Sequence, residues 1–286
     1  MKSISLKSYA KINIALNCYE VFDGEHHRLD MVMLPLELHD SIIAEKLPVI
    51  ADNYVTIDDY SLGVIKYNIA TAAIELLQNK YGFQQTFDVF IHKNIPIRAG
   101  LGGGSSNAAF TIKAINSLMK LGMSRDEMLE AAKQLGADVA FFVDCVPARA
   151  QGYGEILTPI TIKNNYYVLL VKPKEGCSTK EVFNKTDELE VKTYDIDAVI
   201  EALENGDDDK LAASIGNSLE DAAFEIVPQI KQIKDKLKSL GLKIVLMSGS
   251  GSSVFAMSTN LKELRKAADQ FDDKECFVEI TKIKKK

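Results

Sequence analysis

A short run of glycines, residues 100–106, is the part of the sequence best suited to holding a ligand through its backbone. It reads Gly-Leu-Gly-Gly-Gly-Ser-Ser and precedes a segment whose apolar residues recur at helical spacing until Gly122. Without side chains, the first N–H groups of that helix are open to an anion, most commonly a polyphosphate. The alternative is a flexible connector with a serine cap, yet each ordered glycine costs about 0.5–1 kcal/mol relative to alanine. We therefore predict phosphate binding by Gly100, Leu101, Gly102, Gly103, Gly104, Ser105 and Ser106.

This run matches neither of the two commonest phosphate-binding patterns. No lysine follows the last glycine, as one does in the Walker A loop. Ser105 stands where the dinucleotide-binding pattern has its third glycine. We expect a phosphate loop of a less common kind.

A second glycine-rich run reads Met-Ser-Gly-Ser-Gly-Ser-Ser over residues 247–253 and lies between two apolar runs, residues 244–247 and 254–257. It is longer and richer in glycine than a simple hairpin turn requires. A loop that closes over phosphate or substrate is the better interpretation.

Lys11 and Asn13 lie two residues apart in a run, residues 11–18, that has strand-like alternation. Side chains two apart on a strand project from the same face, so the ammonium group and the amide share one space. Spacing alone favours an ordinary solvent-exposed face. The alternative is a pair of polar groups that serve a site.

Asp138 leads an otherwise apolar run, residues 139–143, that begins soon after Gly136. One interpretation is a helix N-cap, which aspartate commonly supplies. The other is a carboxylate at the mouth of a site. The sequence leaves both open.

Composition limits the class of protein. The 286 residues are 47% hydrophobic and 26% charged, which is typical of a soluble globular chain with one large or two smaller cores. The net charge of −6 argues against nucleic acid as the main partner. No run of about 18 apolar residues predicts a membrane span, and the amino end does not read as a signal peptide. The scattered cysteines and histidines give no metal-ligand spacing and indicate a reducing cytoplasm.

Periodicity predicts alternating helices and strands along most of the chain. A capping box, Ser124 with Glu127, opens one of the helices. The expected strands cover residues 3–8, 11–18, 86–93, 166–171 and 276–280, and the expected helices cover residues 65–81, 124–135, 195–204, 207–220, 228–240 and 261–271.

Three motifs, in this order over almost the whole chain, resemble those of the GHMP small-molecule kinases. They are Ala10-Lys-Ile-Asn13, the stretch from Ile95 to Ala109, and Leu246-Met-Ser-Gly-Ser-Gly251. Within that superfamily the sequence is most similar to the branch that phosphorylates the 2-hydroxyl of a methylerythritol linked to cytidine diphosphate. The segments that carry this closer likeness are residues 135–142, 152–155 and 178–183.

The resemblance implies an α/β fold with two lobes and the active site in the cleft between them. A ribosomal-protein-S5-like, ATP-binding lobe would cover residues 1–158, and a ferredoxin-like, substrate-side lobe would cover residues 159–286. It also implies ATP with Mg²⁺ as the cofactors and a small-molecule alcohol as the substrate. The oligomeric state is not readable from the sequence.

The resemblance also assigns roles to single residues. Asp138 matches the catalytic aspartate and Lys11 the lysine near it, while residues 100–106 would wrap the ATP phosphates and Ser106 is a candidate Mg²⁺ ligand. Phe183 would stack on the cytosine. The implied substrate-binding residues are Asn13, His26, His27, Phe183, Gly249, Ser250 and Gly251.

The sequence departs from the family in the loop that supplies a second aromatic ring for the base. His26 stands where the family has tyrosine, and Glu25 where it has glycine. Two other functions therefore stay open: a GHMP kinase whose acceptor lacks cytidine, and a nucleotide-binding relative without catalysis. The presence of Lys11, Asn13 and Asp138 together speaks against the second of these.

Overall fold

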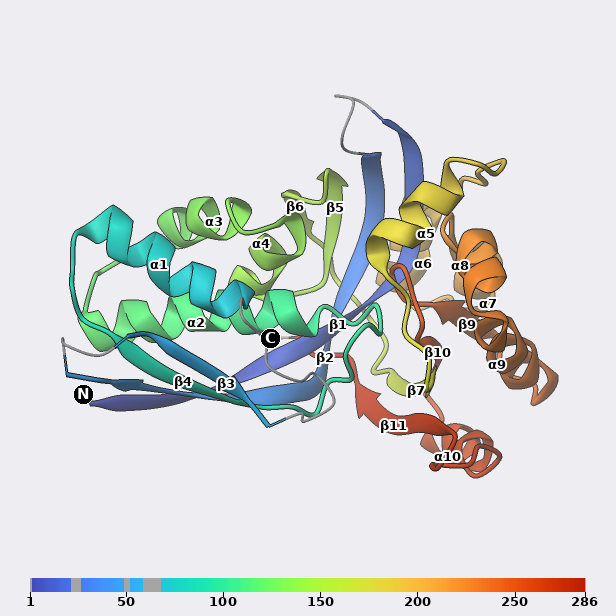
Figure 1. Ribbon diagram of the computed structural model, residues 1–286. Coiled ribbons are helices and arrows are strands. Elements are labelled where there is room, and N and C mark those ends of the chain that lie inside the picture. The colour runs from blue at the N-terminus through green and yellow to red at the C-terminus, as the bar shows by residue number, and fades with distance from the viewer. Residues whose placement is uncertain (1, 22–26, 49–51, 59–67, 286) are drawn as a thin grey trace. The chain divides into compact units, whose positions relative to one another are not determined.

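The computed structural model has an α/β architecture with two β-sheets (Figure 1). It describes residues 2–21, 27–48, 52–58 and 68–285. Among these residues, no helix is long and apolar enough to cross a membrane.

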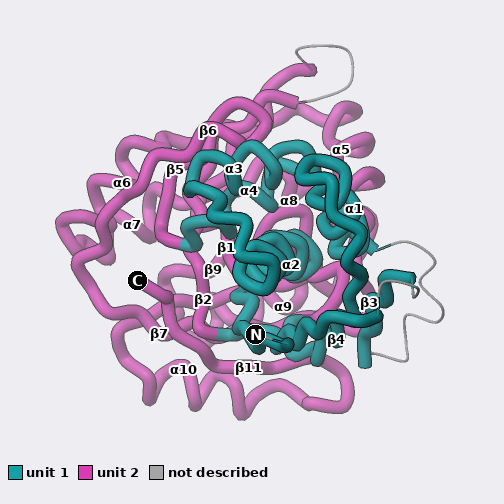
Figure 2. Tube along the Cα trace, turned by 90° about the vertical axis from the view of Figure 1, so that its left-hand side faces the viewer, with its two compact units in different colours: residues 1–10, 38–95, 102–145 teal, residues 11–37, 96–101, 146–286 magenta. Residues whose placement is uncertain are grey.

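The chain divides into two compact units, and each is assembled from separate stretches of sequence (Figure 2). Two long strands, β1 (Ser3–Val21) and β2 (His27–Lys46), contribute to both units. The first unit comprises residues 1–10, 38–95 and 102–145, and the second comprises residues 11–37, 96–101 and 146–286.

In the first unit, helices α1 and α2 lie over one face of the strands, and α3 and α4 pack against α2 (Figure 1). Strand β4 pairs with β3 in parallel and with β2 antiparallel. Its residues Phe87, Val89 and Ile91 are buried and alternate with exposed neighbours, which confirms the predicted strand. The elements are β3 (Tyr54–Ile57), α1 (Ile69–Tyr81), β4 (Phe87–His92), α2 (Gly103–Met119), α3 (Arg125–Lys133) and α4 (Ala137–Asp144).

Side chains and backbone together set the helix ends in this unit. The predicted capping box is present at α3, where Ser124 and Glu127 satisfy each other's backbone N–H groups. Helix α2 ends at Met119 because Lys120 adopts a left-handed conformation with φ of 56°. The stop comes before Gly122, which the sequence had suggested.

In the second unit, a four-stranded antiparallel sheet has the order β11-β7-β10-β9, and α9 and α10 pack against it. Residues 168–171 of β7 are buried on both faces, so this strand is the centre of the core. The elements are β5 (Ala148–Gly152), β6 (Ile156–Pro159), β7 (Tyr167–Pro173), α5 (Thr179–Thr186), α6 (Ile196–Asn205), α7 (Asp208–Ser214), β8 (Gly216–Asn217), α8 (Glu220–Ile226), α9 (Pro228–Ser239), β9 (Ile244–Met247), β10 (Val254–Ser258), α10 (Leu261–Ala268) and β11 (Cys276–Lys282).

The single helix predicted over residues 207–220 is wrong. The segment forms α7, the short strand β8 and the start of α8. Gly216 interrupts the helix and packs so closely on Tyr194 that a Cβ would lie 2.0 Å from the ring. Strand β8 instead pairs in parallel with residues 15–16 of β1.

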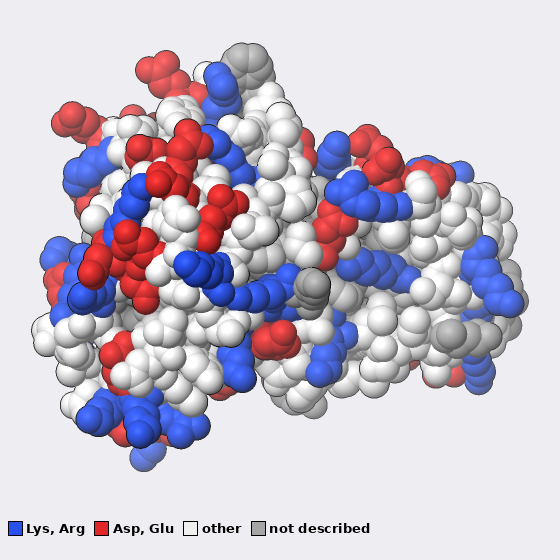
Figure 3. Space-filling model, turned by 180° about the vertical axis from the view of Figure 1, so that it is seen from behind, with Lys and Arg blue, Asp and Glu red and all other residues white. Residues whose placement is uncertain are grey.

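Basic and acidic side chains lie intermixed over most of the face in Figure 3. Several surface charges form ion pairs, such as Lys243 with Asp209 and Lys231 with Asp235. Exposed pairs of this kind contribute about 0–1 kcal/mol each, so they add little to the stability of the fold.

Candidate active site

Helix α2 begins inside the first glycine-rich run and leaves its first N–H groups open. Its N-cap, Gly102, has φ of 69° and offers no side chain to accept a hydrogen bond. The Ser106 N–H donates to Gly102 O at 2.9 Å. The N–H groups before it lie in the first turn, where a helix has no carbonyl of its own to accept them. A Cβ on Gly104 would meet nothing within 4 Å. Open donors, the helix dipole and free space suit a phosphate group.

Ser106 supplies a second, independent observation at the start of α2. Its side chain is fully buried, and its Oγ has no hydrogen-bond partner among the described residues. A buried hydroxyl without a partner costs about 1–3 kcal/mol, so such a group is unusual unless it serves a ligand. The residues present therefore fit a phosphate or its metal ion.

A buried ion pair fixes the backbone that leads into this helix. The Asp40 carboxylate is fully buried and pairs with Lys93, and its Oδ1 accepts hydrogen bonds from the N–H groups of Asn94 and Ile95 at 2.9 and 2.8 Å. Its Oδ2 also accepts from Asn107 Nδ2 at 2.9 Å. Because Asn107 lies on α2, this carboxylate ties the end of β4 to the first turns of the helix.

Lys11 and Asn13 form a buried pair on β1. Lys11 Nζ donates to Asn13 Oδ1 at 2.7 Å, and the two residues are 4% and 1% exposed. The solvent-exposed face that spacing alone favoured is therefore wrong. Burial of an ammonium group is costly unless it is hydrogen-bonded, and the Asn13 amide oxygen supplies such a bond.

Hydrogen bonds join this pair to both glycine-rich runs. Lys11 N–H donates to Leu101 O at 3.0 Å, and Asn13 N–H donates to Ser248 Oγ at 3.3 Å. Ser248 Oγ in turn donates to Gly100 O at 2.9 Å. Three segments far apart in the sequence thus meet at Ser248, which the sequence analysis did not select although it lies within the second run.

The second glycine-rich run closes the hairpin between β9 and β10. A Cβ on Gly249 would lie 3.3 Å from both Lys11 Nζ and Asn13 Oδ1, so this glycine borders the pair. Ser250 Oγ lies 3.0 Å from Thr179 Oγ1, at the start of α5. Gly249 therefore borders the polar pair, and Ser250 connects the turn to the start of α5.

Gly251 lies on the opposite, apolar side of the hairpin. A Cβ there would be 2.9 Å from Met247 Sδ and 3.4 Å from Cys177 Sγ. Burial raises the pKa of the Cys177 thiol to about 11, so it is protonated near neutral pH and packs as a small apolar group. The space next to the Gly251 Cα is thus filled by apolar side chains.

Two of the predicted base-binding residues contact each other. The rings of His27 and Phe183 are 5.1 Å apart between centroids with an interplanar angle of 37°. His27 Nε2 also lies 2.6 Å from Asp187 Oδ1, which holds the imidazole in place. Phe183 lies on α5, a helix that the sequence analysis did not predict, and His26 lies outside the described residues.

A cavity of about 900 Å³ opens beside this pair in the second unit. Of the predicted site residues that the structure describes, His27 alone lines it. Its polar lining includes Arg28, Asp30, Gln151 and Asp187. The cavity therefore adjoins the aromatic pair, and Lys11 and Asn13 do not line it.

Asp138 occupies the first turn of α4, whose N-cap is Gly136. The N-cap interpretation is therefore wrong, and the side chain is half-buried at the positive end of the helix dipole. Residues 139–143 after it are buried, and α4 packs against α2, the helix that carries Ser106. A carboxylate on a rigid, buried helix can be held steadily for proton transfer.

Comparison with known proteins identifies the family. Domain families described as GHMP kinases N terminal domain and GHMP kinases C terminal match residues 68–145 and 199–276. The 4-diphosphocytidyl-2-C-methyl-D-erythritol kinase of Geobacillus kaustophilus (strain HTA426) is 38% identical over 89% of this chain and 88% of its own length.

Solved structures agree on the fold. A crystal structure of 4-(cytidine 5'-diphospho)-2C-methyl-D-erythritol kinase is similar with a TM-score of 0.80 and 27% identity, over 98% of this chain and 100% of that one. Homoserine kinase from Cytophaga hutchinsonii reaches a TM-score of 0.79 at 17% identity, over 99% of this chain and 95% of that one, and shows the shared fold alone. The predicted α/β fold is confirmed. This chain belongs to the GHMP kinases, in the family of the 4-diphosphocytidyl-2-C-methyl-D-erythritol kinases.

Proposed function

We propose that the protein transfers a phosphoryl group from ATP to the 2-hydroxyl of 4-diphosphocytidyl-2-C-methyl-D-erythritol, a step of the non-mevalonate isoprenoid pathway. The observation that carries the proposal is the junction at Ser248, where Lys11 and Asn13 are tied to both glycine-rich runs. The names of the relatives support the identity of the acceptor.

The first glycine-rich run would bind the triphosphate. Residues 100–106 offer backbone donors at the start of α2, and the unpartnered Ser106 hydroxyl would face a phosphate oxygen or the Mg²⁺ ion. A bound Mg²⁺ neutralises charge on the phosphate oxygens. The structure supports this assignment through open space at Gly104 and the buried, unpaired Oγ.

Asp138 would accept the proton of the acceptor hydroxyl, and Lys11 would stabilise the negative charge that develops there. In phosphoryl transfer the nucleophile gains little charge early, so orientation and electrostatics contribute more than proton removal. Asn13 orients the Lys11 ammonium group through its Oδ1 and would hold the acceptor. Both polar groups are buried, which strengthens their electrostatic effect.

The base of the acceptor would stack on Phe183, with His26 in the place of the family's tyrosine on its other side. His27 contacts the Phe183 ring and would hold it in position. Imidazole stacks with less area than the tyrosine of the family, so a weaker grip on the base is expected. Gly249 and Ser250 would border the sugar, because they lie beside Lys11, Asn13 and Thr179.

We place the ATP-binding lobe in residues 1–158 and the substrate-side lobe in residues 159–286. We further propose a cytoplasmic enzyme with small-molecule partners, without a role in binding nucleic acid or membranes.

The test is ADP release with ATP and Mg²⁺ in the presence of single acceptors. The panel comprises 4-diphosphocytidyl-2-C-methyl-D-erythritol, mevalonate, phosphomevalonate, homoserine and no acceptor. Release that depends on the cytidyl compound alone supports the proposal. Release with another acceptor alone indicates a related kinase. Binding of ATP without transfer to any of them indicates a protein without catalysis.

The same assay tests Asp138. Asp138→Asn should lower kcat by about 10²–10⁴-fold with little change in the KM for ATP, because the variant keeps the shape but loses the base. Asp126→Asn is the matched control, since Asp126 also occupies a helix first turn and its side chain is 87% exposed. Near-normal turnover in Asp138→Asn would show that the base is a different residue.

A further inference from the structure

Strand β8 is only two residues long, yet it lies next to the part of β1 that carries the polar pair. Gly216 and Asn217 pair in parallel with Ala15 and Leu16, two and three residues beyond Asn13. Asn217 is 2% exposed. A buried amide must satisfy its donors and its acceptor within the protein, so its partners show what it holds.

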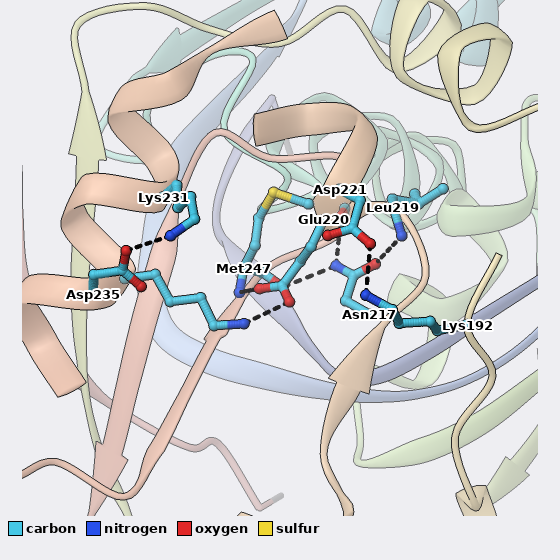
Figure 4. Close-up of polar contacts among 10 residues, drawn as sticks. Lys192, Asn217, Leu219, Glu220, Asp221, Lys231, Asp235 and Met247 are labelled. Atoms are coloured by element: carbon cyan, nitrogen blue, oxygen red, sulfur yellow. Dashed lines mark hydrogen bonds and ion pairs between the residues drawn. The ribbon is translucent and has the colours of Figure 1, made fainter. Parts of the chain in front are cut away.

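The Asn217 side chain is hydrogen-bonded to the backbone of the second glycine-rich run. Its Nδ2 donates to Met247 O at 3.0 Å and to Gly249 O at 2.8 Å, and its Oδ1 accepts from Leu219 N–H at 3.0 Å (Figure 4). The two carbonyls belong to the residues on either side of Ser248. One side chain thus fixes the Met247–Ser248 peptide group, which leads into Ser248, and the Gly249–Ser250 peptide group, which begins one residue after it.

A buried ion pair secures the same turn from a second direction. Glu220 Oε1 accepts from Met247 N–H at 3.1 Å, and its Oε2 lies 2.5 Å from Lys234 Nζ (Figure 4). Met247 is therefore bound through its N–H by Glu220 and through its carbonyl by Asn217. The last residue of β9 has a defined orientation before the chain enters Ser248.

We propose that Asn217 is a positioning residue for phosphoryl transfer, which sets the orientation of Ser248 and, through Ser248 Oγ, the positions of Asn13 and Gly100. The inference rests on the proposed function for its kinetic consequence, while its structural consequence is independent of it. Ser248 Oγ accepts from Asn13 N–H and donates to Gly100 O, so a rotation of the flanking peptide groups would displace both contacts.

The rest of the hairpin does not depend on Asn217. Strands β9 and β10 pair from Met247 with Val254 onwards, and Ser248 N–H donates to Ser253 O at 2.9 Å. Loss of the amide therefore frees the peptide groups around Gly249 without removing the ladder. Gly249 has φ of 56° and lacks a Cβ, so few steric barriers would keep it in place.

A double-mutant cycle tests the proposal. Asn217→Ala should lower kcat by about 10- to 100-fold with less than about twofold change in the KM for ATP, because misplacement of an orienting group affects the reaction more than binding. Ser248→Ala should produce a similar loss. If Asn217 acts through Ser248, the double variant is no slower than the slower single variant. Losses that multiply would overturn the proposal.

Asn164→Ala is the matched control. Asn164 also donates from Nδ2 to a backbone carbonyl, that of Gly206 at 3.1 Å, and its side chain bonds to Tyr166 and Asp208, which do not belong to the junction. Asn164→Ala should lose about as much stability as Asn217→Ala but keep the kcat of the unmodified protein. A kcat that falls equally in Asn164→Ala and Asn217→Ala would reduce Asn217 to a general stabilising role and overturn the proposal.

Hydrogen exchange gives a readout that requires no substrate. In Asn217→Ala, amides of residues 248–252 should exchange faster while those of β10 keep their protection. Unchanged exchange in the turn would overturn the proposal even if the kinase function holds. Faster exchange in a protein that phosphorylates no acceptor would support the role of Asn217 in holding the turn and would refute the proposed kinase function. If Asn217→Ala does not fold, Asn217→Ser, which keeps one hydroxyl donor, is measured in the same way.

Discussion

The two glycine-rich runs have similar composition, but Gly104 in the first and Gly251 in the second have opposite surroundings. Gly104 faces open space, and no atom lies within 4 Å of where its Cβ would be. A Cβ on Gly251 would lie 2.9 Å from Met247 Sδ. Glycine therefore leaves open space at Gly104 and permits close packing of protein atoms at Gly251.

The polar groups of the two runs differ in the same way. At the start of α2 the N-cap offers no side-chain acceptor to the first N–H groups, and the Ser106 hydroxyl has no hydrogen-bond partner among the described residues. Ser248, by contrast, has its hydroxyl engaged twice and its flanking carbonyls bound by Asn217. The first run therefore holds a buried hydroxyl without a protein partner, whereas the polar groups around Ser248 are engaged within the protein.

Gly100→Ala should produce the largest change in stability, because Gly100 is the point at which the two runs touch. A Cβ there would lie 1.9 Å from Ser248 O, and φ is +73°. We expect the free energy of unfolding to fall by about 2–4 kcal/mol from strain and overpacking together. Urea denaturation measures it.

Gly122→Ala separates the two causes. Gly122 has nearly the same φ, +67°, but nothing lies within 4 Å of its Cβ position. This variant should lose only about 1–2 kcal/mol, the cost of the left-handed conformation. Equal losses in the two variants would show that the contact with Ser248 contributes nothing.

Ser106→Ala should separate activity from stability. The variant removes a buried hydroxyl that has no protein partner, so the free energy of unfolding should stay the same or rise slightly. Loss of a contact to the phosphate or its metal ion should lower kcat by about 100-fold. The control is Thr111→Val on the same helix, where the lost hydroxyl donates to Asn107 O at 2.8 Å. Thr111→Val should lose stability and keep kcat. If Ser106→Ala likewise loses stability and keeps kcat, Ser106 serves only the fold.

Sequence reasoning found the parts of the site that local patterns encode. The glycine runs, the capping box at Ser124 and the shared strand face of Lys11 and Asn13 depend on residues close in the chain. The burial of that face could not be predicted, because the turn that borders it, at Ser248 and Gly249, lies 235 residues from Asn13 in the sequence. The period of a strand shows which side chains share a face and not which distant segment packs on that face.

The supporting residues were missed for a similar reason. Asn217 falls inside the single helix that the sequence predicts over residues 207–220, and nothing in its neighbourhood marks it as functional. Asp40 likewise lies in a long strand, and only the fold brings it to Asn94 and Ile95. The role of a buried polar residue is recognised from its hydrogen-bond partners, which the sequence does not show.

Gly104→Ala should have the smallest effect, and it tests whether the open side of the first glycine-rich run faces a ligand. Gly104 lies in the first turn of α2, so Gly104→Ala should raise the free energy of unfolding by about 0.5–1 kcal/mol through reduced chain entropy. The new methyl group would occupy the space that a phosphate requires, and we expect the KM for ATP to rise about tenfold, which equals about 1.4 kcal/mol. Thermal unfolding and ATP titration measure the two effects on one sample.

Gly103→Ala is the neighbouring control, since its Cβ would instead lie 3.1 Å from Lys93 Nζ and from the Ile95 side chain. That variant should lose stability, because the crowding is internal to the protein. A gain in stability for Gly104→Ala and a loss for Gly103→Ala would show that the protein packs closely at Gly103 and leaves open space from Gly104. If Gly104→Ala gains stability and binds ATP as tightly as the unmodified protein, the open space faces solvent, and the phosphates lie against a different part of the run.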